Sequence, residues 1–380
     1  MATLKQLIDQ YCPDGVEYQN VGTVFQVSNG KGINRSEYQE HGLYPIVDQG
    51  RTFISAWTDA STKLLTEPPY IVFGDHSRER KWIPFNFVPG ADGTKLLKAS
   101  QDDDNLKYLF HALSDLEIPS RGYNRHWSIV RELAIPLPPR EVQDKIVEYL
   151  DTFAALCENL DTDIAQRERQ IAAYREKLLS DDYLTAQTCT EGMMKYERLG
   201  DVAPYSGSRI ASDLLNNSNF VGVDNLLKEM KGKVNSEYGP NTKTVTSFTQ
   251  GDVLVGNIRP YLRKIWFADV DGGCSGDVLA FHPAGISPRF LYHVLCSERF
   301  WSFNVQSSKG AKMPRGDKRV LPEFSIPLPP REVQDKIVAQ LDAMQELIDN
   351  LRLERELRQQ QFDYYRERLL SFPKKNTAEV

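Results

Sequence analysis

The sequence predicts an α+β protein: two mixed α/β globular domains separated by two long helices, which form an antiparallel coiled coil with pseudo-twofold symmetry. Three observations predict this class. They are a long internal repeat, a heptad pattern within each copy of it, and segments rich in β-branched and aromatic residues before each copy. With 380 residues, the chain is long enough for two or three domains.

The internal repeat is the strongest signal in the chain. The segment IPLPPREVQDKIV stands at residues 135–147 and again, unchanged, at 326–338. Without any gap, residues 135–180 match residues 326–371 at 26 of 46 positions. The first copy ends in YREKLLS and the second in YRERLLS. Chance does not produce such a match, so the two halves of the chain share one plan.

Each repeat predicts a long helix that begins at its Pro-Pro pair, because proline is favoured in the first helical turn. Apolar residues then recur at steps of three and four for more than four heptads, as in a coiled coil. Arg167 and Arg358 interrupt this pattern at the same repeat position. The predicted heptad positions are Ile146, Leu150, Phe153, Leu160, Tyr174 and Leu178 in the first copy and Ile337, Leu341, Met344, Leu351, Tyr365 and Leu369 in the second.

These features give the expected domain boundaries. Globular domains cover residues 1–139 and 181–330, the two helices cover 140–180 and 331–372, and a tail covers 373–380. Because a globular segment separates the helices, they most simply bury their heptads against each other as an antiparallel pair. The alternative is two independent coiled coils that recruit partner chains.

The globular domains are expected to mix strands and helices. Segments rich in β-branched and aromatic residues predict strands at 70–73, 82–87, 253–255 and 265–267, and helices are expected at 106–113 and 288–300. A glycine and a basic loop follow the first strand of each pair.

Basic clusters with aromatic neighbours stand out against a net charge of −6, which disfavours a free-standing nucleic-acid binder. They fall at comparable places in both halves. Arginine and lysine can neutralise phosphates, and arginine can pair with guanine edges, although such runs are also ordinary solvated loops. The candidate DNA-binding residues are Arg78, Arg80, Lys81, Arg121, Tyr123, Arg125, Arg259, Arg263, Lys264, Lys309, Lys312, Arg315, Lys318 and Arg319.

Signatures of catalysis are missing from the sequence: we find no GxGxxG, GxxxxGK, HExxH or GxSxG motif. EPPY at 67–70 and the Asp75–Glu79–Lys81 spacing match methyltransferase and nuclease motifs only loosely, and we expect a turn and a charged loop. Five scattered cysteines without a CxxC pair, no export signal and no bilayer-length apolar run predict a cytoplasmic protein with no membrane contact.

The repeat also carries a family resemblance. Two variable segments, each followed by IPLPPxxxQxxI and a long helix that ends in YRxxLL, resemble the specificity (S) subunit of type I restriction-modification systems. The run CPDGVEY at 12–18 resembles the usual opening of that family, and the resemblance covers nearly the whole chain. It implies that each variable segment is a target recognition domain that reads one half of a bipartite, asymmetric site in double-stranded DNA. The helices would set the unread spacer.

The resemblance further implies a targeting subunit with no catalytic activity of its own. Two methyltransferase (M) subunits and two restriction (R) subunits would be its partners. S-adenosylmethionine, ATP and Mg are expected in those partners, and no cofactor in this chain. Three alternatives stay open: a specificity subunit of a related system without the full type I motor, a bivalent protein-binding adaptor, and an enzyme with a hidden site.

Overall fold

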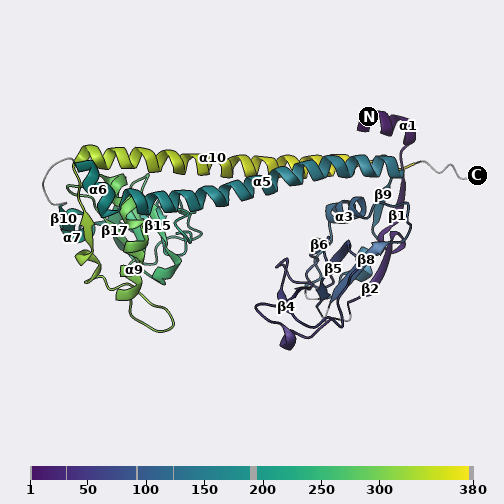
Figure 1. Ribbon diagram of the computed structural model, residues 1–380, viewed down its shortest axis with the longest axis horizontal. Coiled ribbons are helices and arrows are strands. Elements are labelled where there is room, and N and C mark those ends of the chain that lie inside the picture. The colour runs from purple at the N-terminus through teal and green to yellow at the C-terminus, as the bar shows by residue number, and fades with distance from the viewer. Residues whose placement is uncertain (1, 31, 91–92, 123, 189–194, 376–380) are drawn as a thin grey trace, which may run out of the picture. The chain divides into compact units, whose positions relative to one another are not determined.

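The computed structural model describes residues 2–30, 32–90, 93–122, 124–188 and 195–375. The chain divides into two compact units, drawn with their helices and strands in Figure 1. Unit 1 comprises Met1–Leu160 and Glu354–Val380, and unit 2 comprises Asp161–Leu353. Each hydrophobic cluster lies within one unit, so each unit has its own core.

Unit 1 places most of its short strands before the first long helix. Its elements are α1 (Leu4–Tyr11), β1 (Glu17–Asn20), α2 (Val21–Val24), β2 (Phe25–Asn29), η1 (Arg35–Glu37), β3 (Tyr44–Val47), β4 (Ala56–Thr58), β5 (Tyr70–Gly74), β6 (Arg80–Ile83), β7 (Val88–Pro89), β8 (Thr94–Ala99), α3 (Leu106–Asp115), α4 (Trp127–Val130) and β9 (Ala134–Leu137).

The main sheet of unit 1 is antiparallel, in the order β2-β8-β5-β6, and its central strand β5 is buried on both faces. On its central strand β5, Ile71 and Phe73 belong to the core shared with α3, whereas Val72 belongs to a second cluster on the other face. This is the alternation that a strand imposes on its side chains. A smaller sheet, β4-β3-β7, contains the parallel pair of β3 and β7, and β1 pairs with β9.

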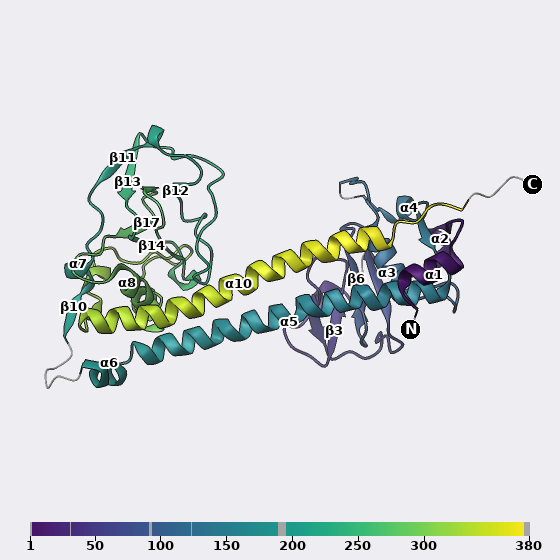
Figure 2. The same ribbon diagram turned by 90° about the horizontal axis from the view of Figure 1, so that it is seen from above.

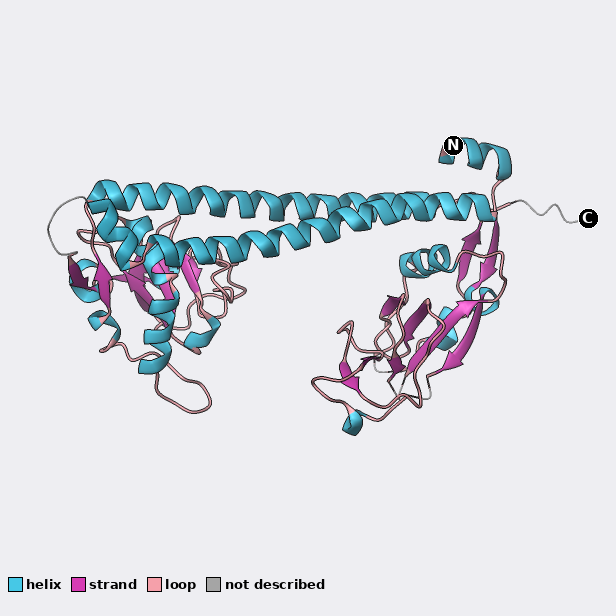
Figure 3. Cartoon of the chain, in the orientation of Figure 1, coloured by secondary structure: helices cyan, strands magenta, loops and turns pink. Residues whose placement is uncertain are grey.

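Unit 2 follows the same order along the chain. Its elements are α6 (Asp181–Thr188), β10 (Tyr196–Arg198), α7 (Leu199–Val202), β11 (Arg209–Ala211), η2 (Ser212–Leu214), β12 (Phe220–Val221), β13 (Thr244–Phe248), β14 (Val253–Gly256), η3 (Pro260–Leu262), β15 (Ile265–Phe267), β16 (Gly272–Cys274), β17 (Val278–Phe281), α8 (Pro288–Leu295), α9 (Glu298–Ser307), η4 (Leu321–Glu323) and β18 (Ser325–Pro327). Figure 3 shows both units by secondary structure.

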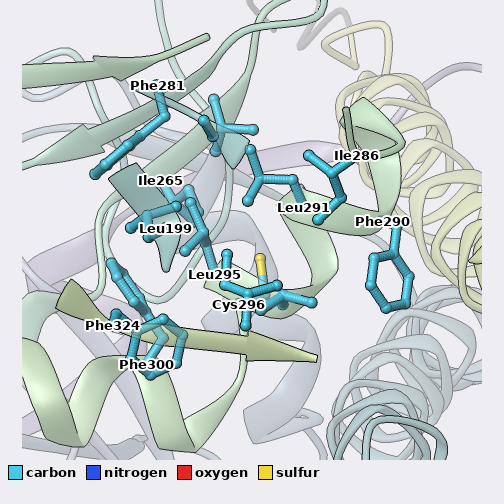
Figure 4. Packing of buried hydrophobic residues seen from close by; sticks show 14 of the residues in the cluster. Leu199, Ile265, Phe281, Ile286, Phe290, Leu291, Leu295, Cys296, Phe300 and Phe324 are labelled. Carbon is cyan, nitrogen blue, oxygen red and sulfur yellow. The ribbon is translucent and has the colours of Figure 1, made fainter. Parts of the chain in front are cut away.

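The two units share a topology. The antiparallel sheet β15-β14-β17 of unit 2 matches β6-β5-β8, and backbone bonds from Ser206 to Ala280 and from His282 to Pro204 extend it where β2 lies in unit 1. The parallel pair of β12 and β16 matches β3 and β7, and β10 with β18 matches β1 with β9. Figure 4 shows the core of unit 2, where Leu291 and Leu295 of α8 lie towards the sheet and Phe290 lies towards the long helices.

The two long helices are α5 (Arg140–Leu178) and α10 (Arg331–Leu369). Within each unit they lie side by side, as Figures 1 and 2 show. Phe153 stacks on Tyr365 in unit 1, with ring centroids 5.2 Å apart, and Arg352 lies 2.6 Å from Glu168 in unit 2. Partner numbers fall as α5 numbers rise, which is the order of an antiparallel pair. The predicted intramolecular pairing is therefore confirmed.

The heptad positions differ in burial along the helices. Those fully enclosed are Ile146, Leu150, Leu178, Ile337 and Leu341; those half-buried are Phe153, Leu160, Met344, Leu351 and Leu369; Tyr174 and Tyr365 are exposed at their edges. The two interrupting arginines bond along their own helices, Arg167 to Asp163 and Gln170, and Arg358 to Glu354 and Gln361.

Two expected elements end at different places. The strand expected at 82–87 is β6 and stops at Ile83, because Pro84 has no N–H for the ladder. The helix expected at 288–300 is two helices, α8 and α9, because the Ser297 hydroxyl accepts from the Phe300 N–H and starts a new helix. Within the described ranges, no helix is long and apolar enough to span a membrane.

The pairing of α10 with the unit 2 core predicts a position-specific loss of stability. Leu341→Ala removes a fully buried side chain, so we expect the free energy of unfolding to fall by about 2–5 kcal/mol. Leu347→Ala, on the same helix but 45% exposed, is the control and should cost about 0.5 kcal/mol or less. Urea unfolding followed by circular dichroism measures both, and equal losses would contradict this packing.

Candidate nucleic-acid interface

The β5–β6 hairpin of unit 1 carries the first basic cluster, and its arginines bond to backbone carbonyls just after α3. Arg78 donates Nη1 to the Ile118 oxygen over 2.7 Å, and Arg80 donates Nη2 to the Leu116 oxygen over 2.7 Å. Arg78 has a φ of +63°, a left-handed conformation that is uncommon outside glycine. The hairpin is thus attached to the end of α3.

Lys81 is buried rather than displayed. Its ammonium group donates to the Asp48 oxygen over 2.8 Å and to the Thr52 oxygen over 2.6 Å, and burial lowers its pKa. The nearby Asp75 carboxylate accepts from the Trp127 N–H over 2.8 Å. These bonds hold loops together, as expected for the charged-loop interpretation.

The second basic segment, residues 120–131, is held against the end of β5 by a buried histidine. His126 donates its backbone N–H to the Asp75 oxygen over 2.8 Å, and its Nδ1 lies 3.0 Å from the same oxygen. Its Nε2 accepts from the Arg121 N–H over 3.1 Å. One ring nitrogen accepts and the other faces a carbonyl, so this network requires the neutral ring with its proton on Nδ1.

This anchoring leaves two arginines at the surface. Arg121 and Arg125 are exposed, and their side chains make no hydrogen bond or ion pair with any described residue. Tyr123 lies outside the described residues. Two free guanidinium groups therefore lie beside the hairpin of unit 1.

The β14–β15 hairpin of unit 2 carries the corresponding cluster. Arg259 and Arg263 both have left-handed backbones, at φ values of +53° and +49°. Arg263 forms an ion pair with Glu298 at 2.7 Å, and Lys264 donates to the Val223 oxygen. Arg259 is exposed, and no described residue bonds its side chain.

The loop at 309–319 lies against this hairpin and is rich in internal pairs. Lys309 and Arg319 both pair with Asp317, and the bond from Lys309, followed by those from Arg319, lowers the pKa of that carboxyl to about 2. Arg315 pairs with Asp277 at 3.0 Å, and Lys318 donates to the Gly276 oxygen.

Lys312 is the remaining basic residue of this loop. It is exposed, and its ammonium group bonds to nothing within the described part of the chain. Together with Arg259, it gives unit 2 two unengaged cations.

Each unit thus brings together its basic hairpin and the basic segment before its repeat. In each unit, this contact is made by the residue that follows the glycine at the end of the central strand. The Asp75 oxygen accepts from the His126 N–H in unit 1, and the Asn257 oxygen accepts from the Gly316 N–H over 3.3 Å in unit 2. Backbone bonding of Arg259 to Pro314 adds to the contact. The two units therefore have similarly placed basic surfaces that are built from different side chains.

Sequence reasoning missed a buried glutamine in each repeat copy. Gln143 accepts from the Asn105 N–H over 2.8 Å and donates to the Pro138 oxygen over 2.8 Å. Gln334 makes the same two bonds, to Ser287 and to Pro329, both over 2.9 Å. Asn105 and Ser287 precede α3 and α8, so each glutamine attaches a globular helix to its long helix. The unchanged glutamine of the repeat was the available signal.

Sequence reasoning also missed a charged contact about two turns further along each long helix. In unit 1, Lys107 lies 2.7 Å and His111 4.0 Å from Asp151. In unit 2, Arg289 lies 3.0 Å and His293 2.8 Å from Asp342. Burial is the main cause that lowers the pKa of His111 to about 4 and lowers that of His293 as well. Asp151 and Asp342 occupy the same repeat position, which was the available signal.

Two units of one topology, each with a basic hairpin and a basic loop in contact, define a protein with two related mixed α/β domains, each of which packs on parts of both long helices. The model of the type I restriction modification DNA specificity domain matches residues 13–167 and 192–360. The chain therefore belongs to the family of type I restriction-modification DNA specificity proteins.

Individual relatives agree with this family. The chain is 25% identical over 410 residues to a type I restriction enzyme specificity subunit of Escherichia coli, covering 100% of this chain and 99% of the relative. It is 25% identical over 296 residues to a putative specificity subunit of Haemophilus influenzae, covering 70% and 72%. The crystal structure of an S subunit from M. genitalium shares the fold, with a TM-score of 0.56 and 18% identity, covering 94% and 96%.

The buried histidine of unit 1 predicts a pH dependence of stability. Because folding lowers the pKa of His111 from 6.5 to about 4, the unfolded chain binds the proton in this range and the folded chain does not. The contribution of His111 to the free energy of unfolding is therefore largest above pH 6.5. It falls by about 3 kcal/mol as the pH drops towards 4. In His111→Phe this part of the slope should vanish. Urea titrations from pH 7.5 to about 4 test it, and parallel curves for both proteins would contradict it.

Proposed function

We propose that the chain is the non-catalytic DNA-specificity subunit of a type I restriction-modification enzyme. The domains at 1–139 and 181–330 each read one half of a bipartite, asymmetric site in double-stranded DNA. The helices at 140–180 and 331–372 set the spacer between the half-sites and bind the methyltransferase and restriction subunits, and residues 373–380 form a tail.

The observation that carries this proposal is one scaffold built twice with different surface residues. The glutamine bridge, the aspartate contact and the central hairpin recur in both units. The unengaged side chains differ, however: Arg121 and Arg125 in unit 1, against Arg259 and Lys312 in unit 2. Two similar domains with dissimilar exposed groups suit the reading of two unlike sequences.

Among the basic residues singled out from the sequence, Arg121, Arg125, Arg259 and Lys312 have side chains with no partner within the described ranges, so we assign them the direct contacts with DNA. An arginine without a protein partner can pair in a bidentate manner with a guanine edge, and a free lysine can neutralise a phosphate. The remaining basic candidates stabilise loops in the protein, so we assign them a positioning role.

The family and the net charge support the proposed partners. With a net charge of −6, we expect two methyltransferase subunits to supply much of the phosphate-binding surface. These subunits would hold S-adenosylmethionine and flip the target base, and two restriction subunits would use ATP and Mg. We place this assembly in the cytoplasm.

Co-expression with the methyltransferase of its operon tests the proposal. In an unmethylated host, genome-wide mapping of methylated bases should give a split motif with a fixed spacer. Replacing residues 192–325 by the matching segment of a relative should change one half of the motif and leave the other half unchanged. A continuous motif, or a change in both halves, would overturn the assignment of one domain to each half-site.

Arg125→Ala tests the role of an unengaged cation. In the reconstituted complex, we expect weaker binding to a cognate duplex, by about 1–3 kcal/mol if Arg125 touches a base edge. Lys5→Ala, an exposed cation on α1, is the matched control. Fluorescence anisotropy at fixed salt measures both, and equal affinities for the two variants would remove Arg125 from the interface.

A further inference from the structure

A cavity of about 470 Å³ in unit 1 is walled largely by arginines. It lies between the β5–β6 hairpin, the residues that follow α3 and the carboxyl-terminal part of α10. Its charged lining residues are Arg51, Arg78, Arg80, Arg366 and Glu79. Such a density of guanidinium groups is unusual in a chain whose net charge is −6.

Neighbouring carboxylates match these charges only in part. Arg366 lies 3.7 Å from Asp115 and 3.2 Å from Asp363. Arg78 and Arg80 bond to carbonyl oxygens and form no ion pair with a described residue. Burial, followed by the nearby Arg366 and Arg78, lowers the pKa of Arg80. The guanidinium groups therefore repel one another.

Two guanidinium nitrogens beside this cavity are poorly satisfied. Nε of Arg80 is buried and makes no hydrogen bond with any described residue, and Nε of Arg366 is buried with the Asp115 carboxylate 3.7 Å away. A buried donor without an acceptor costs about 1–3 kcal/mol. An oxyanion in the cavity would offset the repulsion between the arginines that line it, because guanidinium groups match the geometry of phosphate.

We propose that this cavity, the arginine pocket, binds a phosphate group of the DNA backbone. This inference rests on the proposed function and deepens it, since it assigns a contact that holds the duplex in place without reading its sequence.

The source of the phosphate follows from the surroundings of the pocket. The Arg51 side chain is 92% exposed, so the pocket opens to solvent. Ile118, which receives the Arg78 bond, stands just before the segment that exposes Arg121 and Arg125. The arginines of the pocket and the two exposed arginines of this segment together suit a chain of phosphates better than one small anion.

The same repeat position carries a comparable arginine in unit 2. Arg175 of YREKLLS corresponds to Arg366 of YRERLLS, and its Nε is also buried without an acceptor among the described residues. It lines a cavity of about 530 Å³ whose other charged lining residues are Glu168, Arg169, Glu229, Lys231 and Arg352. An arginine at this repeat position thus lines a cavity in both units.

Phosphate binding to the full-length chain is the first arm of the test. At equal ionic strength, phosphate should raise the Tm above the value in chloride, because a ligand that binds only the folded state stabilises it. Arg366→Gln should abolish this shift. Arg51→Gln, whose exposed side chain cannot disturb the core, should reduce it. Arg368→Gln removes an exposed charge from the same helix outside the pocket and should keep the full shift.

DNA binding by the complex with the methyltransferase is the second arm. Between 50 and 200 mM salt, Arg366→Gln should lower the slope of log affinity against log salt by about one, for cognate and non-cognate duplexes alike. One lost phosphate contact changes the salt response over this range about three- to four-fold. Arg368→Gln should leave the slope unchanged.

Each other outcome overturns the proposal. Absence of a phosphate shift in the wild-type chain, or its persistence in Arg366→Gln, removes the pocket as an anion site. A lost shift with an unchanged salt slope identifies a free anion as the ligand. Loss of methyltransferase assembly identifies a carboxylate of the partner. If the methylation motif is split but Arg366→Gln leaves the salt slope unchanged, only the pocket proposal is wrong. If Arg366→Gln abolishes the phosphate shift in Tm but the methylation motif is not split, only the proposed function is wrong.

Discussion

The amide side chain of one buried glutamine in each repeat copy fixes how a globular domain sits on its helix. Gln143 and Gln334 each satisfy a backbone N–H before a globular helix and a carbonyl of the Pro-Pro turn. An amide bonded at both ends in a dry environment tolerates little change in angle, because a broken bond leaves a buried polar group unpaired. The basic loops are attached to that same framework, so their presentation depends on it.

A second contact on each long helix shows that residues of the repeat support the globular domains, whereas the exposed loops vary. Asp151 pairs with Lys107 of α3, Asp342 pairs with Arg289 and His293 of α8, and the heptad residues beside them close the core. Since repeat residues supply these bonds, the exposed loops are free to differ. This explains why a chain can keep 26 of 46 residues in its repeat and yet share few residues between its two basic surfaces.

The helices were predictable and most of the side-chain roles were not. The Pro-Pro pair and the heptads placed α5 and α10 closely, and a local pattern decides such elements. The basic clusters looked alike in sequence, yet Lys81 is buried on two carbonyls while Arg125 is free. This difference depends on residues about 30 to 50 positions away in the sequence. Lys81 bonds to the Asp48 oxygen, whereas Arg125 lies in a segment that is held through His126 at the Asp75 oxygen. The local sequence pattern does not identify partners so far away. The partners of Gln143 and of Asp151 could not be predicted for the same reason.

The closure of unit 1 by the far end of α10 has a consequence for how the protein is made. Backbone bonds join Val16 to Pro373 and Lys375, and the Tyr18 hydroxyl donates to the Phe372 oxygen. Unit 2 needs only residues 161–353, a continuous stretch of chain. On the ribosome, where amino-terminal domains ordinarily fold first, the order is reversed. The domain translated first must wait, with part of its core exposed, until the last helix has emerged.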